Sequence, residues 1–120
     1  MGAYILPLDE LGMGDVDTVG GKNASLGEMI SNLSNLGVTV PGGFATTAAA
    51  YRKFLSADGL DKRIHSLLND LNVDDIDALT SAGAAIRGWI LEAPLPEELM
   101  RDVKAAWQEM SAGQDIAVAV

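Results

Sequence analysis

The sequence contains no cysteine among its 120 residues. A disulfide scaffold, a zinc site built from thiolates and a cysteine nucleophile are therefore excluded. Long apolar runs are also absent, because none approaches the roughly 18 to 20 residues that a membrane-spanning helix needs. Residues 1–7 lack the basic and apolar regions of a secretory signal. These absences predict a cytoplasmic protein without a membrane partner.

Basic residues are scarce as well. Only 8 Lys and Arg side chains stand against 17 Asp and Glu, which gives a formal net charge of -9. Such a balance repels the phosphates of nucleic acids and of anionic lipids, so neither is a predicted partner. The same field opposes a nucleoside triphosphate. A site for one would need a local cation, backbone N–H donors and Mg²⁺.

Apolar residues make up 48% of the chain, which is enough for one modest core, and many recur at helical spacing. The first stripe predicts one amphipathic helix over residues 22–36, ended by a left-handed cap at Gly37. Its exposed residues are expected to be Glu28 and Asn32. Its buried residues are expected to be Leu26, Met29, Ile30 and Leu33.

Two more stripes follow. A second helix is predicted to begin near Thr46-Thr47, where a hydroxyl can cap it, and to end at Asp58-Gly59. The third begins at Leu60. The residues expected to face inward along these two helices are Tyr51, Phe54, Leu55, Leu60, Ile64, Leu67, Leu68 and Leu71.

The fourth and fifth helices carry clear boundary signals. Asp74 and Asp75 are candidate caps of the fourth, which Pro94 prevents from continuing. Pro96 opens the fifth in its first turn, and Gly113 ends it. The residues expected to face inward are Ile76, Leu79, Gly83, Ile86, Ile90, Leu99, Val103, Ala106 and Met110.

Short extended pieces complete the expected fold, which is α+β and mainly helical. A turn at Pro41-Gly42-Gly43 lies between Val40 and Phe44. Apolar residues alternate with alanine over residues 116–120, which is the pattern of a strand entering a sheet. Because an unpaired apolar strand is an aggregation hazard, this pattern predicts that residues 1–120 are a fragment truncated within a strand.

The run Gly20-Gly21-Lys22 is the strongest candidate for a binding site. Paired glycines before a helix let amides point outward, and the lysine adds a full charge beside the positive end of the helix dipole. It is not a P-loop, because Val16 and Asn23 fall where that motif needs Gly and Ser or Thr. The alternative is a glycine turn with a solvated lysine.

Three segments together carry a resemblance to a known family: LGMGDVDTV at residues 11–19, GGKNASLGEMI at 20–30 and VTVPGGFATTAAAYRKF at 38–54. They resemble the opening of the phosphoenolpyruvate synthases, the pyruvate, water dikinases, and the similarity runs over essentially all 120 residues. Ala49 departs from it, since an acidic residue is expected there. The resemblance implies that residues 1–120 are the N-terminal part of an ATP-grasp-like nucleotide-binding domain. It places Lys22 among the ATP-binding residues, with Gly20 and Gly21 shaping the loop.

The resemblance also implies the activity of the whole enzyme. ATP and water would convert pyruvate into phosphoenolpyruvate, AMP and phosphate through a phosphohistidine in a later domain. His65, the single histidine, is then an ordinary surface or boundary residue. No catalytic residue or metal ligand is expected here, since Mg²⁺ would bind mainly outside this stretch. The remaining domains of the same chain are expected partners, a homodimer is compatible with the family, and the fragment alone would be inactive.

Rival interpretations remain open at this stage. Pyruvate, phosphate dikinase and rifampin phosphotransferase share a GGK element and a similar segment around Pro41. A different class is an acidic helical interaction module with no nucleotide site. The acidic residues 74–77 and 97–98 could suggest Mg²⁺ ligands, but their places at helix starts favour capping. Trp89 and Trp107 lie beside apolar stripes and are interpreted as packing residues.

Overall fold

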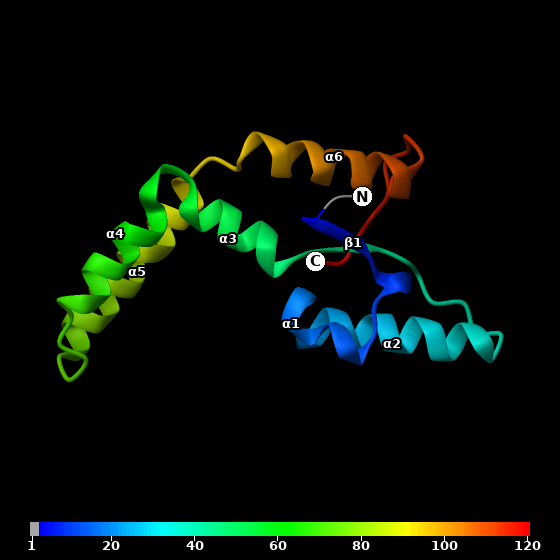
Figure 1. The fold of residues 1–120 in the computed structure, drawn as a ribbon, viewed down its shortest axis with the longest axis horizontal. Helices are drawn as coiled ribbons and strands as arrows, with labels where there is room; N and C mark the ends of the chain where they lie inside the picture. The colour runs from blue at the N-terminus through cyan, green and yellow to red at the C-terminus, as the bar shows by residue number, and fades with distance from the viewer. Residues whose placement is uncertain (1–2) are drawn as a thin grey trace. The chain divides into compact units, whose positions relative to one another are not determined.

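The computed structural model describes residues 3–120, which divide into two compact units. One unit runs up to Tyr51 and resumes at Glu97–Val120, and the other is Arg52–Pro96. The chain is mainly helical with one small sheet (Figure 1), which confirms the predicted α+β class. Among residues 3–120, no helix combines the length and the hydrophobicity needed to cross a lipid bilayer.

The sheet of the first unit has two antiparallel strands, β1 (Ile5–Pro7) and β2 (Phe44–Thr46). The pairing sets Ile5 opposite Thr46, and the Ile5 side chain is fully buried. Thr47 adds a side-chain hydrogen bond at the end of this strand pair, since its hydroxyl donates to the Ala3 carbonyl at 2.6 Å. Of the extended pieces predicted beside residues 41–43, the one that begins at Phe44 forms β2, whereas residues 38–43 carry no regular secondary structure. The strand β1 was not predicted, because three residues are too few to show a period.

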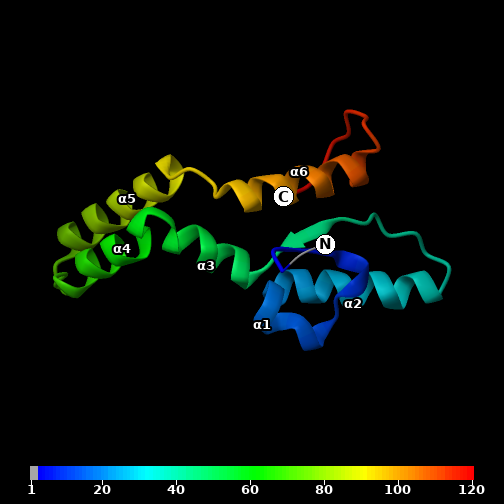
Figure 2. The ribbon, with the colours of Figure 1, turned by 45° about the horizontal axis from the view of Figure 1, so that its top comes forward.

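Two helices cover one side of this sheet. The short helix α1 (Val16–Val19) leads into α2 (Gly21–Asn35), preceded by the 3-10 turns η1 (Leu8–Glu10) and η2 (Met13–Asp15). Both views place the sheet between this pair and α6 (Figures 1 and 2). The buried cluster here consists of Leu11, Val19, Ala24 and Ala45, with Leu6 and Leu8 packed against it.

The face that α2 buries differs from the predicted one. Ile30 is buried and Glu28 and Asn32 are exposed, as predicted, but Met29 is 47% exposed and its prediction was wrong. Leu26 and Leu33 are half-buried. The buried face runs through Ala24, Gly27 and Ile30 because small residues let residues 8–11 approach the helix backbone closely.

The helix α6 (Glu97–Ser111) covers the other side of the sheet and contacts β1. Leu99 and Ala106 are buried and Val103 and Met110 are half-buried, so its inward face was predicted correctly. The helix ends as expected, with Ala112 and Gly113 both at positive φ. Pro96 lies immediately before the helix.

The second unit is built around a helical hairpin. The helix α3 (Ala48–Ser56) leads through η3 (Ala57–Gly59) into α4 (Leu60–Asn69), and α5 (Ile76–Glu92) packs beside α4 (Figures 1 and 2). The Arg63 guanidinium lies 4.2 Å from the Trp89 ring centroid, which joins the two helices by a cation–π contact.

The capping residues of α3 and α5 are among those predicted, but fewer apolar side chains of these helices are buried than predicted. Thr47 caps α3 by accepting from the Ala50 amide at 3.2 Å, and Asp75 caps α5 through the Ala78 amide at 3.1 Å. Predicted inward residues that are instead largely exposed are Tyr51 on α3 and, on the hairpin, Leu68, Ile76 and Leu79. Two helices of a hairpin bury only the stripes that they turn toward each other, so a wide apolar face stays open within the unit.

The predicted strand at residues 116–120 is not formed in the structure. This segment carries no regular secondary structure, and Val118 is 50% exposed. The alternating side chains are suited to a strand, but a strand also needs the backbone groups of a neighbouring strand. The only sheet among residues 3–120 consists of β1 and β2.

Candidate functional site

The Gly20-Gly21-Lys22 run forms the junction between α1 and α2. Gly20 has φ 84° and ψ 164°, a conformation that is essentially restricted to glycine. Its amide donates to the Val16 carbonyl at 2.8 Å, and its carbonyl accepts from the Ala24 amide at 3.1 Å. Gly20 thus ends one helix and begins the next within a single residue, and the backbone requires a glycine there.

The first turn of α2 presents unpaired donors. Within residues 3–120, the amides of Gly21, Lys22 and Asn23 have no hydrogen-bond acceptor, and no side chain caps the helix. The Asn23 side-chain amide donates to the Val19 carbonyl at 2.9 Å, which fastens α1 to this turn. Because the Gly20 amide is already bonded to Val16, Gly20 shapes the turn and does not itself offer a donor.

Neither Lys22 nor Gly21 blocks access to the start of α2. The Lys22 side chain is exposed and makes no hydrogen bond or ion pair within the described part of the chain. A Cβ added at Gly21 would meet nothing within 4 Å, so neither packing nor backbone conformation demands a glycine there. No acidic residue occupies the first turn of α2. Three free amides, a helix dipole and one ammonium group therefore favour an anion at this point.

Two further contacts join the loop at Met13 to α2, and sequence reasoning missed them. The Glu28 carboxylate accepts from the Met13 amide at 3.1 Å, and it lies against Gly12. Met13 also receives a hydrogen bond at its sulfur from the Ser25 hydroxyl, at 3.6 Å. No motif signals these contacts, because the paired residues are 12 and 15 positions apart and each is ordinary in its own segment.

The other candidate residues do not gather into a site. His65 is exposed on α4, and Asp74 and Asp75 lie at the start of α5. No group of three or more Asp, Glu, His or Cys side chains in residues 3–120 is placed to hold a metal ion.

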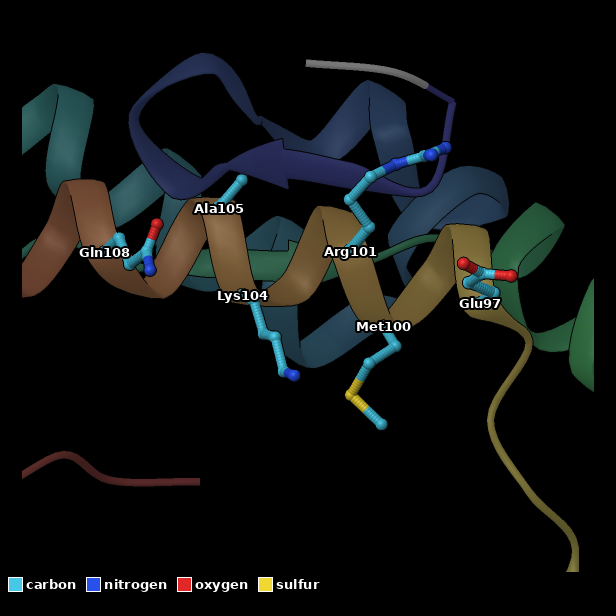
Figure 3. A pocket seen from close by; sticks show the side chains of 6 residues that line it. All are labelled: Glu97, Met100, Arg101, Lys104, Ala105 and Gln108. Atoms are coloured by element: carbon cyan, nitrogen blue, oxygen red, sulfur yellow. The ribbon is translucent and has the colours of Figure 1, made fainter.

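A shallow hollow lies elsewhere, on α6, where it is lined by Glu97, Met100, Arg101, Lys104, Ala105 and Gln108. All of these belong to one helix. Figure 3 shows that Met100 and Lys104 project to one side of α6 while Arg101 projects to the other. Side chains that diverge in this way cannot enclose a ligand, so the helix junction remains the better candidate.

Comparison with known proteins shows which family the chain resembles. Residues 16–120 match the family model described as pyruvate phosphate dikinase, AMP/ATP-binding domain. The chain is 56% identical over 118 residues to phosphoenolpyruvate synthase of Pseudomonas aeruginosa (strain UCBPP-PA14), which covers 98% of this chain and 15% of that protein. It is 54% identical over 120 residues to phosphoenolpyruvate synthase of Neisseria meningitidis (strain MC58), and the match covers 98% of this chain and 15% of that protein. Identity to phosphoenolpyruvate synthase of Escherichia coli K12 is 50% over 113 residues, and the match covers 94% of this chain and 14% of that protein. The chain thus spans about 15% of the length of these curated relatives.

Proposed function

This chain belongs to the pyruvate phosphate dikinase AMP/ATP-binding domain family, and from that premise we propose that residues 20–22 bind phosphate groups of ATP. The observation that carries the proposal is the group of three unpaired amides beside an exposed lysine at the start of α2. Lys22 supplies the charge, Gly21 supplies an amide and free space, and Gly20 supplies the backbone shape. In a chain of net charge -9, such a concentration of positive potential is needed to hold a triphosphate.

We further propose that the protein in which this chain acts is a phosphoenolpyruvate synthase. It would use ATP and water to convert pyruvate into phosphoenolpyruvate, with AMP and phosphate as the other products. The phosphate would pass through a histidine outside residues 1–120, and the remaining domains of the same polypeptide would hold pyruvate and most Mg²⁺ ligands. The full domain would be ATP-grasp-like. A cytoplasmic location and a homodimer remain predictions of the sequence.

Two rival functions are less well supported. Pyruvate, phosphate dikinase and rifampin phosphotransferase would use the same ATP turn, but the relatives compared above carry the name phosphoenolpyruvate synthase. An acidic interaction module would have no need of a cation beside uncapped amides. The helix α4 also begins after a glycine without a side-chain cap, but its first turn carries the acidic Asp61, whereas that of α2 carries Lys22 and no acidic residue. The open apolar face of the α4–α5 hairpin is the feature that favours such a module.

The Lys22→Ala variant tests the ATP site in the full natural polypeptide that contains this chain. Loss of a charge-assisted contact to phosphate should weaken ATP use by about 2 to 4 kcal/mol. Exchange of isotope between pyruvate and phosphoenolpyruvate should be largely unchanged, because that half-reaction does not need ATP. Lys22→Arg should retain part of the activity, since it keeps the charge.

Lys62→Ala is the matched control, because Lys62 is also exposed but lies on α4. It should affect neither half-reaction. If exchange falls in parallel with ATP use in Lys22→Ala, or if neither changes, Lys22 does not bind ATP phosphates and the turn is a solvated helix start.

A further inference from the structure

The loop before α1 is closed on itself and then tied to α2. The Gly12 amide donates to the Asp15 carboxylate at 3.0 Å, and the Asp15 amide donates back to the Gly12 carbonyl at 3.0 Å. Between them, the Met13 amide donates to Glu28 Oε2 at 3.1 Å. A carboxylate of the second turn of α2 thus holds a loop that lies 15 residues earlier in the chain.

Gly12 is matched to this carboxylate. A Cβ at residue 12 would lie 2.7 Å from Glu28 Oε2, closer than two such atoms can approach. The φ of Gly12 is −153°, an extended conformation open to any residue, so the backbone alone does not require glycine. A methyl group at residue 12 would instead displace Glu28 Oε2, the flexible end of a side chain and the same atom that accepts from Met13.

The hydrogen bond between Met13 and Glu28 closes a stretch of chain that contains the proposed ATP turn. Residues 13–28 run from the Met13 amide through α1 and Gly20 to Glu28, and Lys22 lies inside this closed stretch. Two neutral side chains of α2, Asn23 and Ser25, hold the same stretch at Val19 and Met13. Of these three side chains only Glu28 is charged, and hydrogen bonds to a charged acceptor are stronger than those between neutral groups.

We propose that Glu28 is a positioning residue for ATP binding: through Met13 it holds residues 12–19 against α2 and keeps the Gly20–Gly21–Lys22 turn in its phosphate-binding shape. The inference rests on the function proposed above. Glu28 itself does not contact the nucleotide. A turn that is released from its tether occupies the competent shape for a smaller fraction of the time, and the apparent dissociation constant rises by the inverse of that fraction.

The sign of the effect separates this role from simple electrostatics. If Glu28 acted only through its negative charge, its removal would strengthen binding of an anionic nucleotide. As a tether, its removal weakens binding. Glu28→Gln distinguishes the two roles, because the amide oxygen of glutamine can still accept from Met13 while the charge is gone.

Three variants of the full natural polypeptide test the proposal with ATP and Mg²⁺ as the probe. Glu28→Ala removes the acceptor, and Gly12→Ala displaces the carboxylate without altering it, since the flexible end of Glu28 can turn away. Both should raise the dissociation constant for ATP by about two- to tenfold, the size expected from one lost hydrogen bond. Glu28→Gln should stay within about twofold of the parent. Glu109→Ala, an exposed glutamate on α6, is the control and should change nothing.

Amide hydrogen exchange gives a readout that does not depend on nucleotide. The hydrogen-bonded amides of residues 12–20 should exchange faster in Glu28→Ala and Gly12→Ala than in the parent, and at the parental rate in Glu28→Gln. If Glu28→Ala fails to fold, Gly12→Ala carries the test alone. Unchanged or tighter ATP binding in Glu28→Ala and Gly12→Ala would overturn the proposal, and so would a Glu28→Gln variant as weak as Glu28→Ala. If Lys22→Ala also leaves ATP binding intact, the proposed ATP site itself is wrong. If Lys22→Ala weakens ATP binding while the Glu28 and Gly12 variants do not, only the positioning role of Glu28 is wrong.

Discussion

Gly20 and Gly21 are adjacent, yet the structure requires a glycine at only one of them. Gly20 occupies a backbone region that side chains exclude, whereas Gly21 is the first residue of α2 with free space around its Cα. The fold alone therefore explains Gly20. Nothing within 4 Å requires a glycine at residue 21, which is also true of Gly14, Gly42 and Gly88, and the open space leaves room for a phosphate group.

Substituting the two glycines should separate stability from binding. Gly20→Ala should lower the free energy of unfolding by about 1 to 3 kcal/mol, because alanine is strained at φ 84° and ψ 164°. Gly21→Ala should leave stability unchanged or raise it by up to about 1 kcal/mol, since alanine favours a helix. Urea unfolding measures both.

ATP titration of the same two proteins completes the comparison. Gly21→Ala should weaken ATP binding despite its normal stability, because its methyl group occupies the space proposed for phosphate. A Gly21→Ala protein that binds ATP as the parent does would place the phosphates elsewhere.

At the level of single residues, the sequence could predict the centre of the candidate site but not its support. Gly20 and Lys22 stand out because paired glycines before a helical stripe are unusual. Glu28 looked like one more exposed helix residue, and it is indeed exposed. Its partner is a backbone amide, which every residue carries, so no side-chain pattern could reveal the pair.

The elements of the fold were predicted well where caps and breakers mark them. The fifth predicted helix begins after Pro96, and the fourth begins at a capping Asp75, as their local chemistry requires. The buried face of α2 was predicted less well. Periodicity favours large apolar residues as the core, whereas the actual contact uses Ala24 and Gly27, because residues 8–11 pack against the helix backbone itself.

The close contact at Gly27 should be sensitive to one methyl group. A Cβ there would lie 2.5 Å from the Leu11 carbonyl oxygen, a backbone atom that cannot turn away. Gly27→Ala should therefore lower the free energy of unfolding by about 1 to 3 kcal/mol, the usual cost of overpacking, despite the higher helix propensity of alanine. Thermal unfolding measures it. A more stable variant would show that residues 8–11 do not pack on α2 as described.

The start of α5 offers a matched pair of carboxylates. Asp75 accepts from the Ala78 amide at 3.1 Å, whereas Asp74 is engaged through its backbone amide, which donates to Asn72. Asp75→Ala should cost about 1 kcal/mol of stability, the usual value of a helix cap, and Asp74→Ala should cost much less. Equal losses in the two variants, read from urea unfolding, would indicate a general charge effect in place of a cap.

The molecule as a whole exposes more large apolar side chains than a self-contained domain needs. Those that are more than two-thirds exposed are Leu36, Val73, Ile76, Leu91 and Val120. Helical periodicity assigned Ile76 to a core, and its exposure shows that periodicity predicts which face is apolar but not whether anything covers it.

We therefore expect the isolated 120-residue chain to be marginally stable or to self-associate. The net charge of -9 opposes association at low salt, so association should strengthen as NaCl screens the repulsion. Sedimentation at low and high NaCl, with thermal unfolding, tests this. A monomer at both salt concentrations with a sharp and highly stable two-state transition would contradict it.

The first unit is discontinuous in sequence, and this has a consequence for the order in which the protein folds during synthesis. Ile5 is synthesised before Thr46 and has no strand partner until Thr46 has followed it. The helix α6, which packs on β1, is made only after all of Arg52–Pro96. The α4–α5 hairpin is local and can form while it is still being translated, whereas the unit that holds Lys22 must wait, with its apolar strand uncovered, for a helix made some ninety residues later.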